Sequence, residues 1–263
     1  MGKSTSWGGV ASWYDEMLKD KDSYQNKVIL PNLLRILFGV DSRLHGNDGR
    51  HVLQKDQTVL DLACGQGFFA RAFTDAGAKV IGADISPELI ALAKQHVPQA
   101  EFHVTPADKL PFLKNASVDA ITIILSIQNM DNVHGVFKEC TRVLKPSGRL
   151  LLVLNHPAFR IPKQSSWGFD EKEKIMYRRL DEYLSESKVK IQMHPGQNPS
   201  EQTLSFHRPL QFYFKSLGKK GLAVTRLEEW NSPKHSEPGP RAKPENRARQ
   251  EFPLFLFLEA IRK

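Results

Sequence analysis

The chain has 263 residues, with 37 Lys and Arg against 29 Asp and Glu, which gives a formal net charge of +8. Hydrophobic residues make up 40% and charged residues 25%, an ordinary globular composition that excludes disorder throughout. The only cysteines, Cys64 and Cys140, exclude a disulfide scaffold and a four-cysteine zinc site. The sequence contains no apolar run of membrane-spanning length, and Met1–Trp13 lacks the apolar core of a signal peptide, so we expect a cytoplasmic protein.

Short apolar runs alternate with amphipathic segments between residues 57 and 155. This alternation predicts an α/β fold, a doubly wound parallel sheet with helices on both faces. The runs are nearly continuous in Val, Ile and Leu, as in strands that are covered on both faces. The predicted strands are Thr58–Ala63, Lys79–Ala83, Glu101–Val104, Val118–Leu125 and Arg149–Leu154, and the predicted helices are Phe68–Ala76, Pro87–His96 and Val133–Leu144.

The segments on either side of this region are less regular. Upstream, Tyr24–Phe38 is predicted to form a helix that bends or restarts at Pro31. Downstream, Asn155–His207 is too long for an ordinary crossover connection. It contains a helical pattern (Met176, Leu180, Tyr183, Leu184) and then two alternating stretches (Val189, Ile191, Met193 and Leu204, Phe206), which predict a helix followed by a β-hairpin. Beyond it we predict a helix over Pro209–Lys220, a strand over Leu222–Trp230, a loop over Asn231–Gln250 and a strand over Phe252–Ile261.

A glycine-containing loop, Asp61-Leu62-Ala63-Cys64-Gly65-Gln66-Gly67, directly follows the first predicted strand and opens a helix. The glycines permit a sharp turn and the close approach of a ligand to the backbone. The free N–H groups at the helix start favour a polar or anionic ligand group. The loop also fits the dinucleotide pattern Gly65-x-Gly67-x-x-Ala70, with Asp84 about 20 residues further on, so NAD is the competing interpretation.

Three carboxylates surround this loop and argue against a dinucleotide. Asp61 ends the first predicted strand, Asp84 ends the second, and Asp108 follows the third. Together they would repel a diphosphate. They suit instead a cationic ligand that carries an amino group, a ribose diol and an adenine, which describes S-adenosylmethionine.

Four motifs in order resemble those of the class I S-adenosylmethionine-dependent methyltransferases, in particular the ubiquinone-biosynthesis-like, small-molecule branch. The resemblance is clear over about residues 57–157 and extends by topology to 222–263. The motifs are Val59–Gly67 (the glycine loop), Gly82–Ser86 (the ribose-binding loop), Ala107–Phe112 (the adenine-edge motif) and Arg142–Leu150 (the turn before the fifth strand).

The resemblance implies roles for the residues around the loop. Asp61 is expected to meet the amino group of the cofactor, Asp84 its ribose and Asp108 its adenine amine. Ser126 follows the fourth strand, where its side chain should face the methyl group and the acceptor. The complete predicted cofactor site consists of Asp61, Ala63, Gly65, Gly67, Asp84, Ile85, Ala107, Asp108, Leu125 and Ser126. No metal is expected, because Asp131-Asn132 fits a helix cap better than a metal site.

The family fold implies seven strands, the last one antiparallel and inserted next to the fifth. We therefore expect one domain over 1–263. Its predicted parts are an N-terminal helical lid (1–55), a cofactor-binding core (56–157), a cap insertion (158–207) and the C-terminal part of the sheet (208–263). The Tyr24–Phe38 helix and the insertion should cover the cofactor and shape the acceptor pocket.

Catalytic residues are less clearly indicated than cofactor contacts. Methyl transfer can proceed largely by positioning, so a general base is not required. If there is one, His156, which follows the fifth predicted strand, is the first candidate and His207 the second. Tyr213 is a further candidate, as a member of an aromatic group that suits a small, partly apolar acceptor.

The basic composition leaves a second substrate class open. The predicted loop over 234–249 carries Lys234, Arg241, Lys243, Arg247 and Arg249, which could bind the phosphate backbone of RNA, tRNA in particular. An ordinary solvated loop is the preferred interpretation of this charge. A catalytically silent cofactor-binding protein is the third interpretation. The acceptor, its reacting atom and the oligomeric state are not determined by the sequence.

Overall fold

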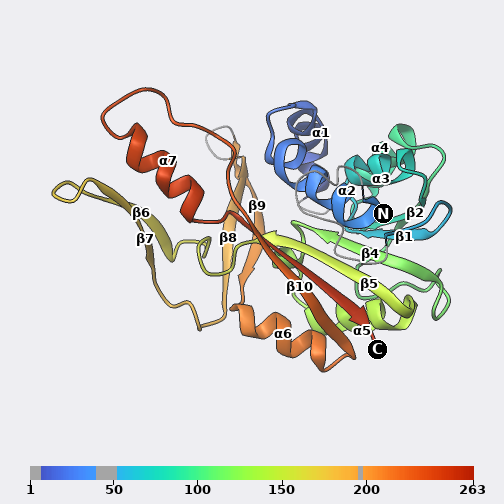
Figure 1. The fold of residues 1–263 in the computed structure, drawn as a ribbon. Coiled ribbons are helices and arrows are strands. Elements are labelled where there is room, and N and C mark those ends of the chain that lie inside the picture. Colours follow the sequence, from blue (N-terminus) through green and yellow to red (C-terminus); the bar gives the residue numbers. More distant parts are fainter. Residues whose placement is uncertain (1–6, 40–51, 195–197) are drawn as a thin grey trace.

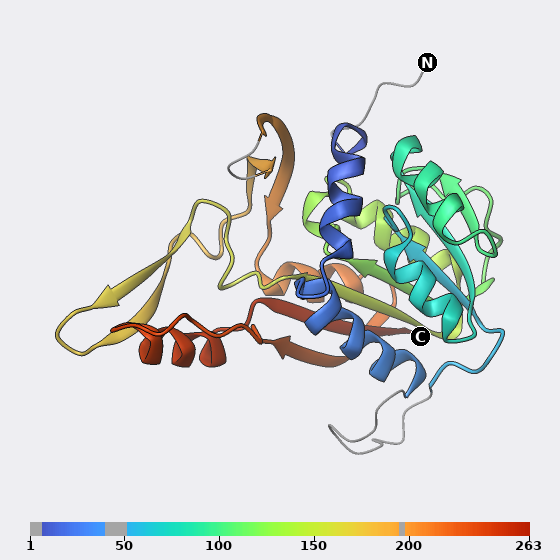
Figure 2. The same ribbon diagram turned by 90° about the horizontal axis from the view of Figure 1, so that it is seen from above.

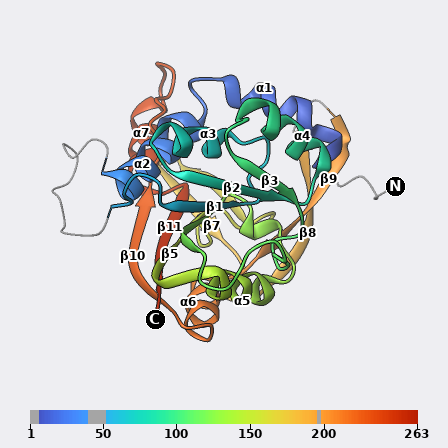
Figure 3. The same cartoon turned by 90° about the vertical axis from the view of Figure 1, so that its right-hand side faces the viewer.

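The computed structural model describes residues 7–39, 52–194 and 198–263, and the side chains of residues 194 and 198–201 lie outside the description. Its centre is a seven-stranded sheet in the order β10-β11-β5-β4-β1-β2-β3, between two layers of helices (Figures 1 and 3). The strands are β1 (Thr58–Leu62), β2 (Lys79–Asp84), β3 (Glu101–Val104), β4 (Val118–Ile124), β5 (Leu144–Asn155), β10 (Leu222–Trp230) and β11 (Phe255–Arg262).

The strand pairing confirms the predicted topology. Strands β1 to β5 run parallel to one another, whereas β11 lies between β5 and β10 and is antiparallel to both. The helices are α1 (Ala11–Lys19), α2 (Leu30–Phe38), α3 (Phe68–Asp75), α4 (Pro87–His96), α5 (Val133–Val143), α6 (Leu210–Gly218) and α7 (Ala242–Glu251). None of the helices in the described ranges has the length and apolar character needed to traverse a bilayer.

Alternating strand residues divide the core into two halves. Val59 and Leu151 belong to the half that α2, α3 and α4 cover, while Leu60 and Leu150 belong to the half covered by α5 and α6. Successive side chains of a strand point to opposite faces, so apolar residues at adjacent positions bury both faces. Cys140 is buried in the α5 half, as expected of a core residue.

The N-terminal segment differs in part from the prediction. The Tyr24–Phe38 helix is present and changes character near Pro31, since a single π-helical turn, η2 (Gln25–Ile29), precedes α2. Its apolar side chains pack into the core against α3 rather than over the ligand-binding edge. A preceding 3-10 turn, η1 (Gly8–Val10), and helix α1 lie above the carboxyl edge of the sheet instead.

The 158–207 insertion contains two hairpins, so the predicted helix over Met176–Leu184 is wrong. These are β6 (Ser165–Asp170) with β7 (Ile175–Leu180), and β8 (Ser187–His194) with β9 (Asn198–His207). Between β6 and β7, the Asp170 carboxylate accepts hydrogen bonds from the Lys172 and Glu173 backbone N–H groups, both at 2.9 Å, and so closes the turn. The second hairpin confirms the prediction.

The basic segment after β10 is helical where a loop was predicted. Helix α7 packs against β7, and together with β6 they form an arm that projects from the body of the molecule (Figures 1 and 2). The Arg241 guanidinium lies over the Phe169 ring, 4.4 Å from its centroid, and Trp167 contacts Phe252 edge-to-face. The arm is therefore held together by aromatic and cation–π contacts.

A buried ion pair between β5 and β11 provides a test of the fold. Arg149 Nε donates to Glu259 Oε1 at 2.6 Å, and Arg149 Nη2 donates to the Ile36 carbonyl at 3.0 Å. Because Glu259→Ala removes the carboxylate that pairs with this buried guanidinium, it should lower the free energy of unfolding by about 3–5 kcal/mol. The double variant Arg149→Met/Glu259→Leu should recover most of that loss. Urea unfolding measures both; a loss below about 1 kcal/mol in Glu259→Ala would contradict the role of the pair.

Candidate active site

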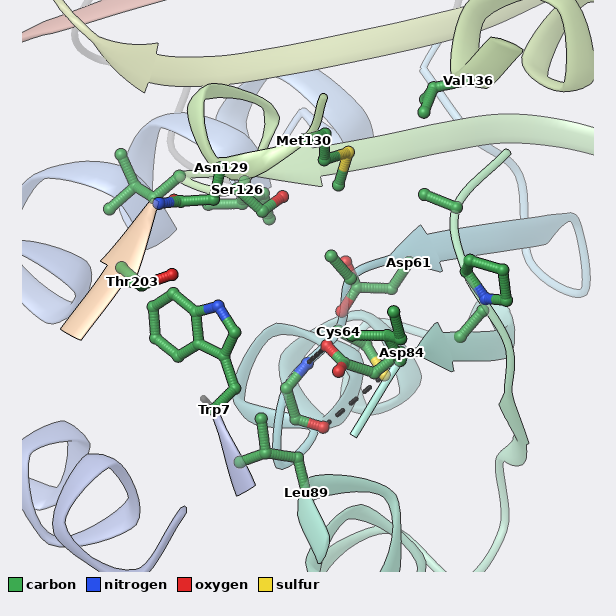
Figure 4. A pocket seen from close by; sticks show the side chains of 18 of the residues that line it. Trp7, Asp61, Cys64, Asp84, Leu89, Ser126, Asn129, Met130, Val136 and Thr203 are labelled. Carbon is green, nitrogen blue, oxygen red and sulfur yellow. Dashed lines mark hydrogen bonds between the residues drawn. The ribbon is translucent and has the colours of Figure 1, made fainter. Parts of the chain in front are cut away.

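A cavity of about 790 Å³ opens at the carboxyl edge of the central sheet (Figure 4). This is the edge at which ligands bind in open α/β sheets, and the volume lies in the range of small-molecule sites. Its walls come from α1, from the chain that follows β1, β2, β3 and β4, and from β8 and β9. The predicted residues that line it are Asp61, Ala63, Gly65, Asp84, Ile85, Ala107, Asp108, Leu125 and Ser126; Gly67 is not among the lining residues.

Asp61 is a buried carboxylate that the chain satisfies on one side only. Its Oδ1 accepts a hydrogen bond from Thr122 Oγ1 at 2.8 Å, while Oδ2 has no partner. Burial raises the pKa of Asp61 to about 7, the Thr122 hydrogen bond opposes this, and the nearby Asp84 adds to it. An unpaired carboxylate oxygen in a cavity is suited to a cationic ligand group.

Asp84 joins the glycine loop to the loop that follows β2. Its Oδ2 accepts from the Gly65 N–H at 3.0 Å and its Oδ1 from the Ser86 N–H at 2.9 Å. Burial raises the pKa of Asp84, and these backbone hydrogen bonds counteract the rise. The Ile85 N–H also contributes a backbone hydrogen bond to this carboxylate. The two oxygens together have about four acceptor sites, so the carboxylate keeps acceptor capacity for a ligand hydroxyl. Ser86, not Asp84, caps helix α4 by accepting from the Leu89 N–H.

The Asp108 side chain is held from the start of α5. Asn132 Nδ2 donates to Asp108 Oδ2 at 2.8 Å, and Asn132 Oδ1 accepts from the Gly135 N–H as the N-cap of that helix. Capping by this Asn132 is as the sequence predicted. Near it, the Ile85 side chain is 51% exposed although it is apolar, and it lines the cavity. Such a surface suits a flat, weakly polar ring.

Strained backbone marks the ends of two central strands. Ala63 after β1 has a φ of 60° and Leu125 after β4 a φ of 52°, both in the left-handed region that costs non-glycine residues energy. Backbone hydrogen bonds hold both, from Ala63 N–H to the Ala83 carbonyl and from Leu125 N–H to the Val153 carbonyl, each at 2.7 Å. The two turns deliver Gly65 and Ser126 to the same cavity.

The comparisons with known proteins agree with this geometry. A family model described as "Methyltransferase domain" matches residues 60–152. This match covers less than half of the chain, and together with the relatives and structures below it supports the class I S-adenosylmethionine-dependent methyltransferase family. A crystal structure of an S-adenosylmethionine-dependent methyltransferase from Mesorhizobium loti is 25% identical, covers 79% of this chain and 92% of that chain, and has a TM-score of 0.65.

Two curated relatives match this chain only in part. A demethylmenaquinone methyltransferase from Renibacterium salmoninarum is 36% identical over 39% of this chain and 44% of its own length. A ubiquinone biosynthesis O-methyltransferase from Xanthomonas oryzae pv. oryzae is 31% identical over 36% and 41%. The chain thus spans less than half the length of either relative. A structure of a complex containing the Haloferax volcanii Trm112 methyltransferase activator matches 97% of this chain at 18% identity and a TM-score of 0.63, which shows the fold alone.

The cavity also contains residues that sequence reasoning did not find. Trp7, Tyr14 and Leu18 extend over it from η1 and α1, and Tyr14 lies against Gly65, where an added Cβ would sit 3.5 Å from its ring. Burial, followed by the charges of Asp84 and Asp61, raises the pKa of Tyr14 to about 12. The available signal was the i, i+4 spacing of Tyr14 and Leu18, which places these two on one face of α1. Other lining residues that were missed are Gln66, Phe68, Phe69, Leu89, Asn129, Met130, Val136, Lys190, Gln202, Thr203 and Leu204.

The predicted catalytic residues lie away from this cavity. His156 is 5% exposed; its Nε2 pairs with Glu229 Oε1 at 2.8 Å and its Nδ1 accepts from the Ala158 N–H, so both ring nitrogens are engaged. Burial lowers the pKa of His156, against the effect of Glu229. Tyr213 is 1% exposed in the core, and burial raises its pKa to about 12. His207 pairs with the Tyr183 carbonyl.

No metal-binding cluster accompanies the site: nowhere in residues 7–39, 52–194 and 198–263 do three or more His, Cys, Asp or Glu gather to hold an ion. The basic residues of α7 do not line the cavity either. The site is therefore described by its carboxylates, its glycine loop and its largely apolar walls.

The unpaired charge of Asp61 predicts a gain in stability when it is removed. The folded-state pKa of about 7 lies above the ordinary value of 3.8, so the native protein loses stability as the pH rises between these values. Asp61→Asn, which keeps an acceptor for Thr122, should raise the free energy of unfolding by roughly 2 kcal/mol at pH 8. The gain should disappear toward pH 4. Urea unfolding measures it, with the exposed Asp75→Asn as the control; equal stability of Asp61→Asn and wild type at both pH values would contradict this account.

Proposed function

We propose that the protein transfers a methyl group from S-adenosylmethionine to an O, N or C atom of a small, partly apolar acceptor. The observation that carries this proposal is the unpaired Oδ2 of buried Asp61 in the cavity. When bound, S-adenosylmethionine supplies an electrophilic methyl group on a sulfonium sulfur, and attack by an acceptor lone pair breaks the carbon–sulfur bond to leave S-adenosylhomocysteine.

The residues of the cavity fit this cofactor group by group. Asp61 Oδ2 would accept from its ammonium, and the remaining acceptor capacity of the Asp84 carboxylate would bind the ribose hydroxyls. The exposed Ile85 and the neighbouring Ala107 would cover the adenine, with Asp108 accepting from its amine. Gly65 would let the cofactor approach the backbone, because its positive φ and missing Cβ keep that wall open.

The acceptor would enter from the side of α1 and the β8–β9 hairpin. Lining residues from these elements are mixed apolar and polar, as small-molecule sites are. The relatives that match the core are named for quinone biosynthesis, which agrees with a small acceptor. The RNA alternative is not favoured, because the basic residues of 234–249 lie on the arm and its flanking loop and do not line the cavity. No histidine lines it among the described residues, so His156 and Tyr213 would support the fold around the site rather than touch the acceptor.

Loss of the Asp84 carboxylate tests the cofactor assignment. Asp84→Ala should weaken S-adenosylhomocysteine binding by about 1.5–3 kcal/mol, because charged hydrogen bonds to the ribose are lost. The affinity of Asp84→Asn for S-adenosylhomocysteine should lie between those of Asp84→Ala and the wild type. The exposed Asp75→Ala serves as the control. Isothermal titration calorimetry measures the affinities, with circular dichroism to confirm folding. Wild-type affinity in folded Asp84→Ala would refute the assignment.

The raised pKa of Asp61 predicts a pH dependence of binding. Asp61 must be ionised to accept from the cofactor ammonium, and its pKa is about 7 before binding. The affinity for S-adenosylhomocysteine should therefore be constant above pH 8 and fall toward tenfold per pH unit below about pH 6.5. Calorimetry between pH 5 and 8 measures this affinity. Asp61→Asn should bind S-adenosylhomocysteine weakly, with an affinity that does not change with pH in this range. A wild-type affinity that is flat from pH 5 to 8 would show that Asp61 is not the ammonium partner.

A further inference from the structure

One side of the cavity is formed by residues that the cofactor assignment does not use. Figure 4 shows Trp7 and Thr203 close to Asn129 and Ser126, on the side away from Asp84. Asn129 Nδ2 donates to the Leu204 carbonyl at 2.7 Å and so fixes β9 to the chain after β4. The Ser126 hydroxyl is buried there without a partner. We call this group (Trp7, Ser126, Asn129, Lys190, Thr203 and Leu204) the acceptor wall.

Lys190 supplies the only basic side chain among the described residues that line the cavity. It lies on β8, directly across the ladder from Leu204. Within the described part of the chain, no carboxylate oxygen lies within 4.0 Å of its ammonium. Lys188, two residues earlier on the same strand, does have such a partner, since its Nζ lies 3.5 Å from Asp131 Oδ2. The positive charge of Lys190 is thus available to a ligand.

A cation at this place would repel the sulfonium centre of the cofactor rather than bind it. Two positive charges in one cavity repel each other, and the repulsion grows as a ligand excludes water. An anionic group lying between them would be attracted by both. The flat indole of Trp7, set edge-to-face on Tyr14 with ring centroids 5.9 Å apart, offers a face on which a planar ring could stack.

We propose that the acceptor is a planar molecule that carries an anionic oxygen, a phenolate or a carboxylate, which Lys190 binds while Trp7 covers its ring. This rests on the methyltransferase function proposed above and names the substrate class of that site. It also accounts for a cavity without histidine, because an acceptor that is held as an anion has already lost its proton to solvent. Lys190 favours the ionised form of a phenol by direct charge pairing.

The test uses the full chain loaded with S-adenosylhomocysteine and two small probes. Para-nitrophenol reports its own ionisation by absorbance, and benzoate represents a ring with a carboxylate. Each probe is titrated into wild type, Lys190→Met, Lys190→Arg and the matched control Lys188→Met. Binding of S-adenosylhomocysteine to each protein is measured first by calorimetry, so that failure of the cofactor site is seen separately.

We expect Lys190→Met to bind S-adenosylhomocysteine like the wild type but the anionic probe about five- to tenfold more weakly. Lys190→Arg should keep most of the affinity and Lys188→Met nearly all of it. Bound para-nitrophenol should titrate at a lower pH than free para-nitrophenol in the wild type and not in Lys190→Met. A preference for one probe decides between phenolate and carboxylate.

Three results would overturn the proposal. If Lys190→Met weakens S-adenosylhomocysteine itself, Lys190 binds the carboxylate of the cofactor instead. If Lys190→Met and Lys188→Met weaken binding of the probes equally, the effect comes from the net positive charge of the region and not from a contact of Lys190. If loaded wild type binds neither probe, the acceptor is not a planar anion. Failure of the wild type to bind S-adenosylhomocysteine would instead refute the proposed function.

Discussion

Two carboxylates buried side by side are the constraint on which the site depends. Asp61 and Asp84 end adjacent parallel strands, and each is less than a tenth exposed. Burial, and after it the charge of Asp84, raises the pKa of Asp61. Among the described residues, the hydrogen-bond donors to these two carboxylates are neutral: a hydroxyl from Thr122 and backbone N–H groups from Gly65, Ile85 and Ser86. Their desolvation is therefore incompletely offset in the protein alone, and a cation with hydroxyl groups is the ligand that completes it.

The strands and helices that hold Asp61 and Asp84 were predictable because the apolar pattern of each segment agrees with its place in the sheet or against it. Five parallel strands read as apolar runs, since both faces of each are buried, and Ser86-Pro87 and Asn132 mark the helix starts that follow. The cofactor was predicted from the glycine loop and from the three aspartates that follow successive strands. The volume of the cavity, and the finding that one oxygen of Asp61 has no partner, required the three-dimensional packing.

Other segments were mispredicted because contacts distant in sequence determine them. Met176, Leu180 and Tyr183 repeat at helical spacing, yet β7 is a strand because it pairs with β6 and because α7 covers it. The loop prediction for Asn231–Gln250 followed from its richness in proline and arginine, although Pro244 near a helix start, with Glu245 in the first turn, is compatible with a helix. Trp7 and Tyr14 contact each other, but their place in the cavity, with Tyr14 against Gly65, depends on contacts distant in sequence. His156 sits at a strand end, as catalytic residues do, but faces Glu229 rather than the cavity.

These points converge on a single ligand arrangement, which a crystal structure of the complex with S-adenosylhomocysteine would test most directly. The account predicts the amino group of the ligand within hydrogen-bond distance of Asp61 Oδ2. It also predicts both ribose hydroxyls on Asp84, with the Gly65 and Ser86 N–H bonds to that carboxylate retained. A ligand bound in the cavity with its amino group away from Asp61, or bound outside the cavity, would contradict it.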